Sequence, residues 1–306
     1  MTVRTHELDK AELHVHLEGS IEAETMSLIA PSLSREEIAA RYSFNSFEQF
    51  LKNFGWVTMH LSTPEHYGMA ATALVRKLES QNVRYAEITL SAGVALRRGQ
   101  DLQAIHRAVM DAAAASSVKT AWIWDAVRQW GVEAAERVVD AAIEHASQGV
   151  VAFGLGGDEA NGPASQFLHV FQRARDAGLR LVCHAGEITA ADSVRQALDC
   201  GAERIGHGIR AVNDVALLRR LARENIPLEI SISSNVLLRA VPDLPSHPIR
   251  RIYDAGVPVV LNTDDPAMFG VTLIGEYELA ARAFGFSEVE MRGLAANGFR
   301  YAFAWL

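Results

Sequence analysis

The stretch K10-A-E-L-H-V-H-L-E-G-S20 contains the pattern on which the fold prediction rests. A short β-rich apolar run, Ala11–Leu17, carries polar side chains at its end and is followed by a more polar segment. The same order recurs along the chain, where apolar runs alternate with amphipathic segments of about 10–18 residues. Such alternation is typical of βα units and a parallel sheet.

Eight segments fit this description, and their number predicts a (β/α)8 barrel. We prefer the barrel to a doubly wound sheet because a polar cluster follows each strand. A barrel gathers all such clusters at the C-terminal face of its strands, whereas an open sheet gathers them only at its switch point. The predicted strands are Ala11–Leu17, Val83–Leu90, Thr120–Ala126, Val150–Leu155, Arg180–His184, Arg204–Gly206, Pro227–Ser231 and Val257–Asn262.

The chain of 306 residues is predicted to form a single barrel domain over residues 1–306. Two segments depart from the alternation. Residues 22–60 form an insertion after the first strand, whose Phe44, Phe47 and Phe50 make either an apolar lid over the barrel mouth or a separate packing cluster. The final segment, Ser287–Leu306, is predicted to be a closing helix.

Charge and composition exclude several classes of protein. A net charge of −8 argues against a nucleic-acid partner, which requires a basic face. The N-terminus has no apolar signal core, and no stretch reaches the roughly 18 apolar residues of a membrane helix, so we expect a cytoplasmic protein without a membrane partner. The 2 cysteines have no zinc-knuckle spacing, so a metal would be held by histidines and carboxylates. The sequence does not predict the oligomeric state.

Polar clusters at the predicted strand ends suggest a metal site. His14 and His16 are two residues apart in a strand, share a face and can bind one ion, although exposed histidines have the same spacing. If the barrel is right, three imidazoles and one carboxylate meet at its mouth and leave a position for water. These four residues are His14, His16, His184 and Asp264.

Three further groups at the same strand ends can handle protons: Glu187, His207 and Asp265. A metal, a water molecule and such groups together make a hydrolase site. Each signal has a structural alternative, because Asp-Asp-Pro also forms turns. The glycine-rich GLGGDEA segment exposes backbone amides but lacks the spacing of a dinucleotide fingerprint.

Taken in order, the motifs resemble the adenosine deaminase family of the amidohydrolase superfamily. They are ELHVHLEGS, GGDE, HAGE, RIGHG, SSN and NTDDPAMFG, and they extend from Ala11 to about Phe303. The resemblance implies one Zn²⁺ per chain, held by the four ligands named above, and a purine nucleoside as substrate. It also implies release of ammonia from C6 of the purine.

The resemblance further implies a role for each remaining site residue. Glu187 would donate a proton to purine N1, and Gly157 would offer its backbone N–H to N3. His207 would orient the zinc-bound water and help to deprotonate it. Asp265 would hold that water and accept from the N7 side.

The glutamate at position 18 does not decide which adenine compound is the substrate. Members specific for adenosine usually carry Asp at this position, where it contacts the ribose 5′-hydroxyl. Relatives that act on free adenine carry Glu, but they tend to have Asp at Gly206 and lack GGDE. A third branch deaminates 6-aminodeoxyfutalosine in menaquinone biosynthesis, and it resembles this chain over RYAEIT…RRG, FGLGG and GEY.

Arg97 and Arg98 are the predicted contacts for the carboxylate of that third substrate, because a guanidinium binds carboxylates bidentately. The alternative is a solvent-exposed basic pair. The predicted function is therefore deamination of an adenine nucleoside, with 6-aminodeoxyfutalosine preferred to adenosine or 2′-deoxyadenosine. Adenine deaminase, a two-metal amidohydrolase and a non-enzymatic binding barrel are the alternatives.

Overall fold

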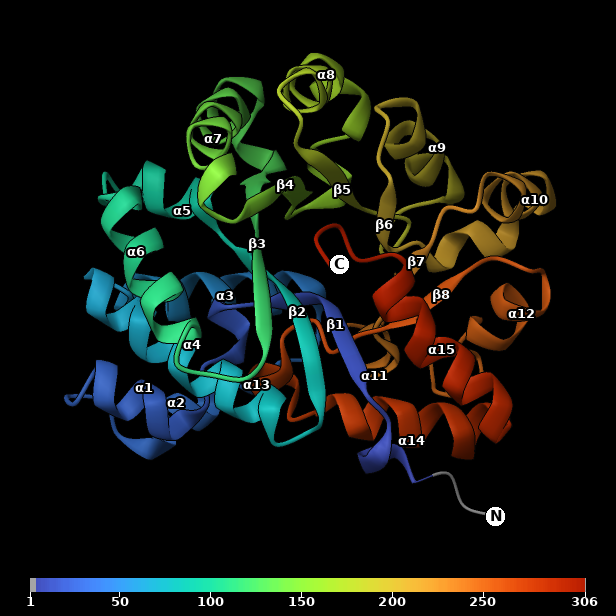
Figure 1. The fold of residues 1–306 in the computed structure, drawn as a ribbon, viewed down its shortest axis with the longest axis horizontal. Coiled ribbons are helices and arrows are strands. Elements are labelled where there is room, and N and C mark those ends of the chain that lie inside the picture. The colour runs from blue at the N-terminus through green and yellow to red at the C-terminus, as the bar shows by residue number, and fades with distance from the viewer. Residues whose placement is uncertain (1–3, 306) are drawn as a thin grey trace.

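Eight parallel strands form a ring in chain order in the computed structural model, which describes residues 4–305 (Figure 1). Each strand from β1 to β7 pairs in parallel with the next. All eight predicted strands are present, with small differences at their ends. They are β1 Lys10–His16, β2 Val83–Leu90, β3 Lys119–Val127, β4 Val150–Gly156, β5 Arg180–Ala185, β6 Arg204–His207, β7 Leu228–Ile230 and β8 Val259–Leu261.

The ring is completed where the chain beyond β8 meets β1. The backbone N–H of His16 donates to the carbonyl of Asp264 (2.9 Å), and that of Asp264 donates to the carbonyl of His14 (3.0 Å). The side-chain oxygen of Asn262 accepts from the backbone N–H groups of Leu13 and His14 at 2.9 and 3.1 Å. These contacts confirm the barrel, and the doubly wound alternative is wrong.

Helices surround the ring, so both faces of the sheet are buried (Figure 1). On β3, Trp122 and Trp124 pack outward against the helices, whereas Ala121 and Ile123 pack inside the barrel. This explains why the strands read as nearly continuous apolar runs. The helices are α1 Ala23–Ile29, α2 Arg35–Arg41, α3 Phe47–His60, α4 Pro64–Glu79, α5 Ala92–Arg97, α6 Leu102–Ala113, α7 Val132–Glu144, α8 Leu168–Asp176, α9 Ala191–Asp199, α10 Val215–Glu224, α11 Ile232–Leu237, α12 Ile249–Asp254, α13 Pro266–Phe269, α14 Leu273–Phe284 and α15 Glu288–Arg300. Within residues 4–305, no helix is both long and apolar enough to cross a bilayer.

The insertion after β1 contains α1, α2 and α3. Ser46 begins α3, where its side chain accepts from the backbone N–H of Gln49 (3.2 Å). The ring of Phe50 stacks on that of Phe269 in α13, with 5.3 Å between centroids, and Phe44 lies edge-on to the same ring at 5.7 Å. These contacts seat α3 on the segment that follows β8, at the C-terminal face of the barrel.

The end of the chain differs from the predicted helix over Ser287–Leu306. Helix α15 ends at Arg300, and residues 301–305 turn into the centre of the ring (Figure 1). There the N–H of Phe303 donates to Glu87 (2.5 Å), and the guanidinium of Arg204 lies 3.7 Å from the Phe303 ring centroid. Beyond the helix, the segment places the ring and the backbone N–H of Phe303 inside the barrel, a position that a continued helix could not reach. Leu306 lies outside the described residues.

Candidate active site

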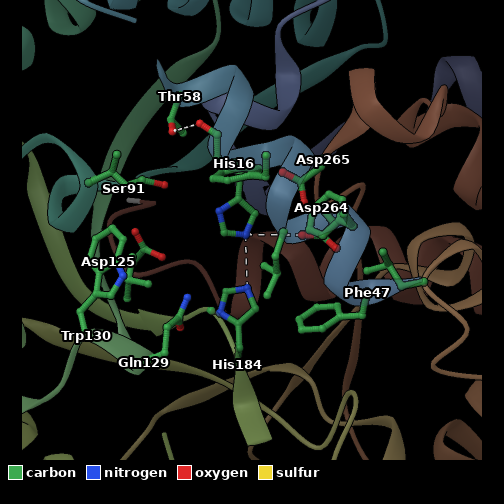
Figure 2. Close-up of a pocket in the computed structure, with 18 of the residues that line it drawn as sticks. His16, Phe47, Thr58, Ser91, Asp125, Gln129, Trp130, His184, Asp264 and Asp265 are labelled. Atoms are coloured by element: carbon green, nitrogen blue, oxygen red, sulfur yellow. Dashed lines mark hydrogen bonds and ion pairs between the residues drawn. The ribbon is translucent and has the colours of Figure 1, made fainter. Parts of the chain in front are cut away.

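The four predicted metal ligands converge at the C-terminal face of the barrel. Nε2 of His16 lies 3.2 Å from Nε2 of His184, and Oδ1 of Asp264 lies 3.4 Å from Nε2 of both His14 and His16. Four ligand atoms bound tetrahedrally at about 2.0–2.1 Å from one ion would be separated by about 3.3 Å. Figure 2 shows His16, His184 and Asp264 directed toward one another. The spacing therefore fits a single ion.

The state of these side chains also fits a metal. Nε2 of His14 is buried and has no hydrogen-bond partner among residues 4–305. Burial lowers the pKa of His16 to about 4 and lowers that of His184 well below its usual value, so both imidazoles are neutral. Neutral imidazole nitrogens are good ligands for zinc and similar ions. Ligand atoms of His14, His184, His207 and Asp264 lie within 4.8 Å of one another, and those of His16, Asp264 and Asp265 form a second group of this kind. The two groups share Asp264, so His207 and Asp265 border the same position.

Two of these residues have an unusual backbone conformation. His207 has a φ of 62° and Asp264 a φ of 67°, in the left-handed region that non-glycine residues rarely adopt. Such strain is concentrated at functional sites, where the surrounding structure holds it. Here it turns the chain sharply at the ends of β6 and β8.

Two glycines leave room for the site. A Cβ atom at Gly206 would lie 2.8 Å from Cε1 of His14, and one at Gly19 would overlap the carboxyl group of Asp265. Neither glycine was singled out for this reason from the sequence. Their role depends on contacts between distant parts of the chain.

A buried ionic chain inside the barrel orients His14. Nδ1 of His14 lies 2.8 Å from Oε2 of Glu229, whose Oε1 lies 2.5 Å from Nε of Arg204. Arg204 also pairs with Glu87 (2.6 Å). The Nδ1–H of His14 donates to this carboxylate, which directs Nε2 toward the metal position. Although burial lowers it, the hydrogen bonds to Asp264 and Glu229 raise the pKa of His14 to about 10, so a metal has to displace the Nε2 proton of this ring. The sequence analysis missed Glu229; its signal was an acidic residue inside the apolar strand β7.

Glu187 is held in place by the loop that follows β5. The carboxylate of Glu159 accepts from the backbone N–H groups of Ile188 (2.8 Å) and Thr189 (3.0 Å), and also from that of Gly186. Burial, together with the negative charges of Asp264 and Glu159, raises the pKa of Glu187 well above its usual value. The Glu187 carboxyl group is therefore protonated and can act as an acid.

Asp265 is also a buried carboxyl group with a raised pKa. Its Oδ1 is buried and has no hydrogen-bond partner among the described residues. Burial and the adjacent charge of Asp264 raise its pKa well above its usual value. Asp264 and Asp265 thus divide into a charged carboxylate among the imidazoles and a second carboxyl group that faces the cavity.

A cavity of about 500 Å³ opens above these groups. Helix α3 supplies one wall through Phe47, Phe50, Leu51, Phe54, Thr58 and Met59. Gly157, with a φ of 96°, lies on the opposite side with Gln129 and Trp130. The insertion therefore forms part of the cavity wall, and its closing over the mouth as a lid stays a prediction.

Comparisons with known proteins agree with this geometry. The adenosine deaminase family model matches residues 9–305. The chain belongs to the adenosine deaminase family. It is 40% identical to an aminodeoxyfutalosine deaminase of Streptomyces avermitilis over 97% of this chain and 87% of that one.

Two solved structures are also similar to the chain. Adenine deaminase from Arthrobacter aurescens has a TM-score of 0.90 and 32% identity, covering 97% of this chain and 94% of that one. A zinc-bound amidohydrolase from Burkholderia ambifaria has a TM-score of 0.88 and 26% identity, covering 98% and 87%. The chain is therefore a deaminase of the adenine or adenine-nucleoside type, a hydrolase of carbon–nitrogen bonds, with a candidate metal site.

In this deaminase, His207 is held by a chain of hydrogen bonds that starts at a backbone amide. The N–H of Ile249 donates to Nδ1 of His247 (3.2 Å). Nε2 of His247 lies 3.1 Å from Oδ1 of Asn235, and Nδ2 of Asn235 lies 3.1 Å from Nδ1 of His207. A backbone amide can only donate, so neutral His247 carries its proton on Nε2. Asn235 accepts the hydrogen bond from this N–H at Oδ1 and donates another from Nδ2 to Nδ1 of His207.

This chain fixes the tautomer of His207. Its Nδ1 is an acceptor, and burial lowers its pKa to about 4, so the proton of the neutral ring is on Nε2. Nε2 faces the cavity, 3.7 Å from Oε2 of Glu187. A donor at Nε2 is compatible with the predicted orienting role, and the predicted help in deprotonating the water stays a prediction.

The tautomer can be measured directly. In the deaminase, ¹⁵N histidine spectra at pH 7 are expected to show His207 protonated on Nε2, with Nδ1 unprotonated. Asn235→Asp replaces the donor with an acceptor and is expected to move the proton to Nδ1 or to charge the ring. Asn235→Gln, which keeps an amide, serves as the control for altered packing. A wild-type signal from protonated Nδ1 would contradict the hydrogen-bond chain.

Glu18 is buried next to the end of β2. It is 1% exposed, its Oε1 accepts from the backbone N–H of Ser91 (3.0 Å), and its Oε2 has no hydrogen-bond partner among the described residues. The side chain is absent from the residues that line the cavity. Its contact with the substrate stays a prediction.

Proposed function

We propose that the protein is a zinc-dependent deaminase that removes the 6-amino group of an adenine nucleoside, with 6-aminodeoxyfutalosine as the preferred substrate. Adenosine and 2′-deoxyadenosine are the next candidates. The observation that carries this proposal is the position of Arg97, which lines the cavity that begins at the metal ligands. The guanidinium lies over the Trp130 ring, 4.7 Å from its centroid.

The proposed metal is one Zn²⁺ per chain, bound by His14, His16, His184 and Asp264. When bound, zinc lowers the pKa of a coordinated water from 15.7 to about 7 and so supplies a nucleophile at neutral pH. The fit rests on ligand spacing of 3.2–3.4 Å and on the neutral imidazoles of His16 and His184. Glu229 orients His14 for this task.

Proton transfer is assigned to groups of the chain itself. Glu187, protonated in its buried position, donates to purine N1 as water attacks C6, so negative charge does not build up on the ring. The Nε2–H of His207 orients the attacking water. Asp265 accepts from that water through one oxygen and donates from its protonated carboxyl group to N7, and the N–H of Gly157 donates to N3. Of the two protons of the attacking water, one restores the Glu187 acid and the other goes to the 6-amino group, which leaves C6 as ammonia.

The two arginines have different surroundings. Arg98 donates to the backbone carbonyls of Met59 and Leu61, each at 3.1 Å, and to that of Thr58. These bonds give partners to carbonyl groups at the C-terminal end of α3, which have none within the helix. Arg97 forms no ion pair with a carboxylate among residues 4–305 and stacks on Trp130. Arg97 is therefore the residue available for a carboxylate on the 5′ substituent.

Substitution of the two arginines should separate these roles. Arg97→Ala is expected to raise KM for 6-aminodeoxyfutalosine by about 10- to 100-fold, because a charged hydrogen bond contributes about 1.5–3 kcal/mol, and to leave KM for adenosine nearly unchanged. Arg98→Ala is expected to lower the melting temperature more than Arg97→Ala. Steady-state kinetics and thermal denaturation of both variants test this. Equal effects of Arg97→Ala on both nucleosides would contradict the assignment.

The substrate itself is tested by ammonia release from 6-aminodeoxyfutalosine, adenosine, 2′-deoxyadenosine and adenine. We expect kcat/KM to be highest for 6-aminodeoxyfutalosine. Activity on adenine alone would overturn the nucleoside proposal. Higher activity on adenosine would agree with the proposed reaction but contradict the proposed 5′ substituent of the substrate.

A further inference from the structure

Asp125 is a buried carboxyl group in the cavity wall without an assigned role. It follows Ala121 and Ile123 on the inward face of β3 and is 5% exposed. Its Oδ1 is buried and has no hydrogen-bond partner among the described residues, although the side chain lines the cavity. A buried carboxyl group without a donor is costly, so its retention points to a donor from a ligand.

The neighbouring strand leaves room for this side chain. A Cβ at Gly154 would lie 3.1 Å from Cβ of Asp125, and one at Gly156 would lie 2.9 Å from Oδ2. Two inward positions of β4 are thus glycine where a larger side chain would displace Asp125. Figure 2 shows the Asp125 carboxyl directed into the cavity beside Ser91 and Trp130, away from Asp264 and Asp265.

We propose that Asp125 is a specificity-determining residue that accepts a hydrogen bond from a sugar hydroxyl of the substrate. The proposal rests on the proposed nucleoside deaminase function. In that function, Glu187 and Asp265 face N1 and N7 of the purine, and Gly157 faces N3. Asp125 lies on β3, next to β4, and Gly157 directly follows β4. The N3 edge of a purine adjoins N9, where the sugar is attached.

The position also accounts for the arrangement of Glu18. Each of the two side chains has one buried carboxyl oxygen without a hydrogen-bond partner among the described residues, Oε2 in Glu18 and Oδ1 in Asp125. They differ in position, because Oε1 of Glu18 accepts from Ser91 and its side chain does not line the cavity, whereas the side chain of Asp125 does. Free adenine has no hydroxyl to donate, so Asp125 favours nucleosides over the base.

One other partner is close enough to be considered. The position of the missing Cβ of Gly156 is 3.5 Å from Nδ1 of His184 as well as 2.9 Å from Oδ2 of Asp125. A carboxylate often accepts from the free nitrogen of a metal-binding imidazole. No hydrogen bond joins Asp125 and His184 in the structure, so we assign Asp125 to the sugar and test the alternative in the same experiment.

The test crosses Asp125 variants with substrates that lack single hydroxyls. Wild-type enzyme, Asp125→Asn and Asp125→Ala are assayed on adenosine, its 2′-, 3′- and 5′-deoxy forms, and adenine. Metal content and melting temperature are measured for each protein. We expect Asp125→Ala to lose about 10- to 100-fold in kcat/KM on adenosine, with Asp125→Asn intermediate and metal content unchanged. Removing the contacted hydroxyl should cost wild type a similar factor and cost Asp125→Ala almost nothing further.

Each other outcome is decisive. If the free-energy losses in kcat/KM caused by the Asp125 variant and by each missing hydroxyl are additive, Asp125 contacts no sugar hydroxyl and the inference is overturned. Equal losses on all substrates together with reduced metal content would assign Asp125 to His184 instead. A wild-type enzyme inactive on all four nucleosides and on 6-aminodeoxyfutalosine would overturn the proposed function itself, whereas an active wild type with additive effects overturns only the role of Asp125.

Discussion

Replacing Glu187 with glutamine is expected to lower kcat by about 10²- to 10⁴-fold, the range typical for loss of a general acid. The amide keeps the size of the side chain and can still hydrogen-bond, but it has no acidic proton for purine N1. Glu159 holds the loop through backbone N–H groups rather than through the Glu187 side chain. The loop should therefore keep its conformation in the variant.

Steady-state kinetics, metal analysis and a substrate-binding measurement together test this prediction. Metal content and substrate affinity should be close to those of wild type. Glu187→Asp is the matched control, because it keeps the acid and shortens its reach, and it should be less impaired than Glu187→Gln. Turnover by Glu187→Gln above a tenth of the wild-type value would mean that another group is the acid.

Loss of the metal is expected to have an effect at least as large. Chelation of wild type, or His184→Ala, should reduce kcat/KM by about 10³-fold or more, because activation of water by the ion is worth several kcal/mol. The melting temperature should fall as well, because an ion that binds only the folded state stabilises it. The effect should be marked here, since the ligand atoms come from β1, β5 and the segment after β8.

Metal analysis and readdition make this test specific. One equivalent of Zn²⁺ should restore the activity and melting temperature of the chelated wild type but not those of His184→Ala. Glu229→Gln is a useful intermediate, because it weakens the hold on His14 and leaves the four ligands in place. Two ions per chain would contradict the single-ion site and favour a two-metal amidohydrolase.

Much of this architecture could be predicted from local sequence. The alternation of apolar runs with amphipathic segments located all eight strands, since burial on both faces requires continuous apolar residues. The metal ligands were also predictable, because a barrel brings the ends of its strands to one face regardless of their distance along the chain. His14 and His184 are far apart in sequence, yet both follow from this rule.

Other residues had no such local signal. Glu18 and Arg98 stand in the expected motifs, but the structure turns Glu18 toward Ser91 and Arg98 toward the carbonyl groups at the end of α3. Both arginines line the cavity, but Arg97 lies over the Trp130 ring and does not bind these carbonyl groups. The direction of each side chain depends on which donors and acceptors other elements place nearby, and sequence spacing does not reveal this.

The sequence by itself determined the barrel and the family resemblance, and it predicted which candidate metal-binding and proton-handling residues meet at one face. It could do so because strand periodicity and the common strand-end face are local properties repeated eight times. Only the tertiary structure decided how these groups are supported and what lines the substrate cavity. The tautomer of His207, the Glu229–Arg204 chain and the unpartnered carboxyl oxygen of Asp125 all arise from contacts between strands and helices remote in sequence. Such contacts exist only after the chain has packed, so only the packed structure shows that the side chain of Asp125 lines the cavity and that of Glu18 does not.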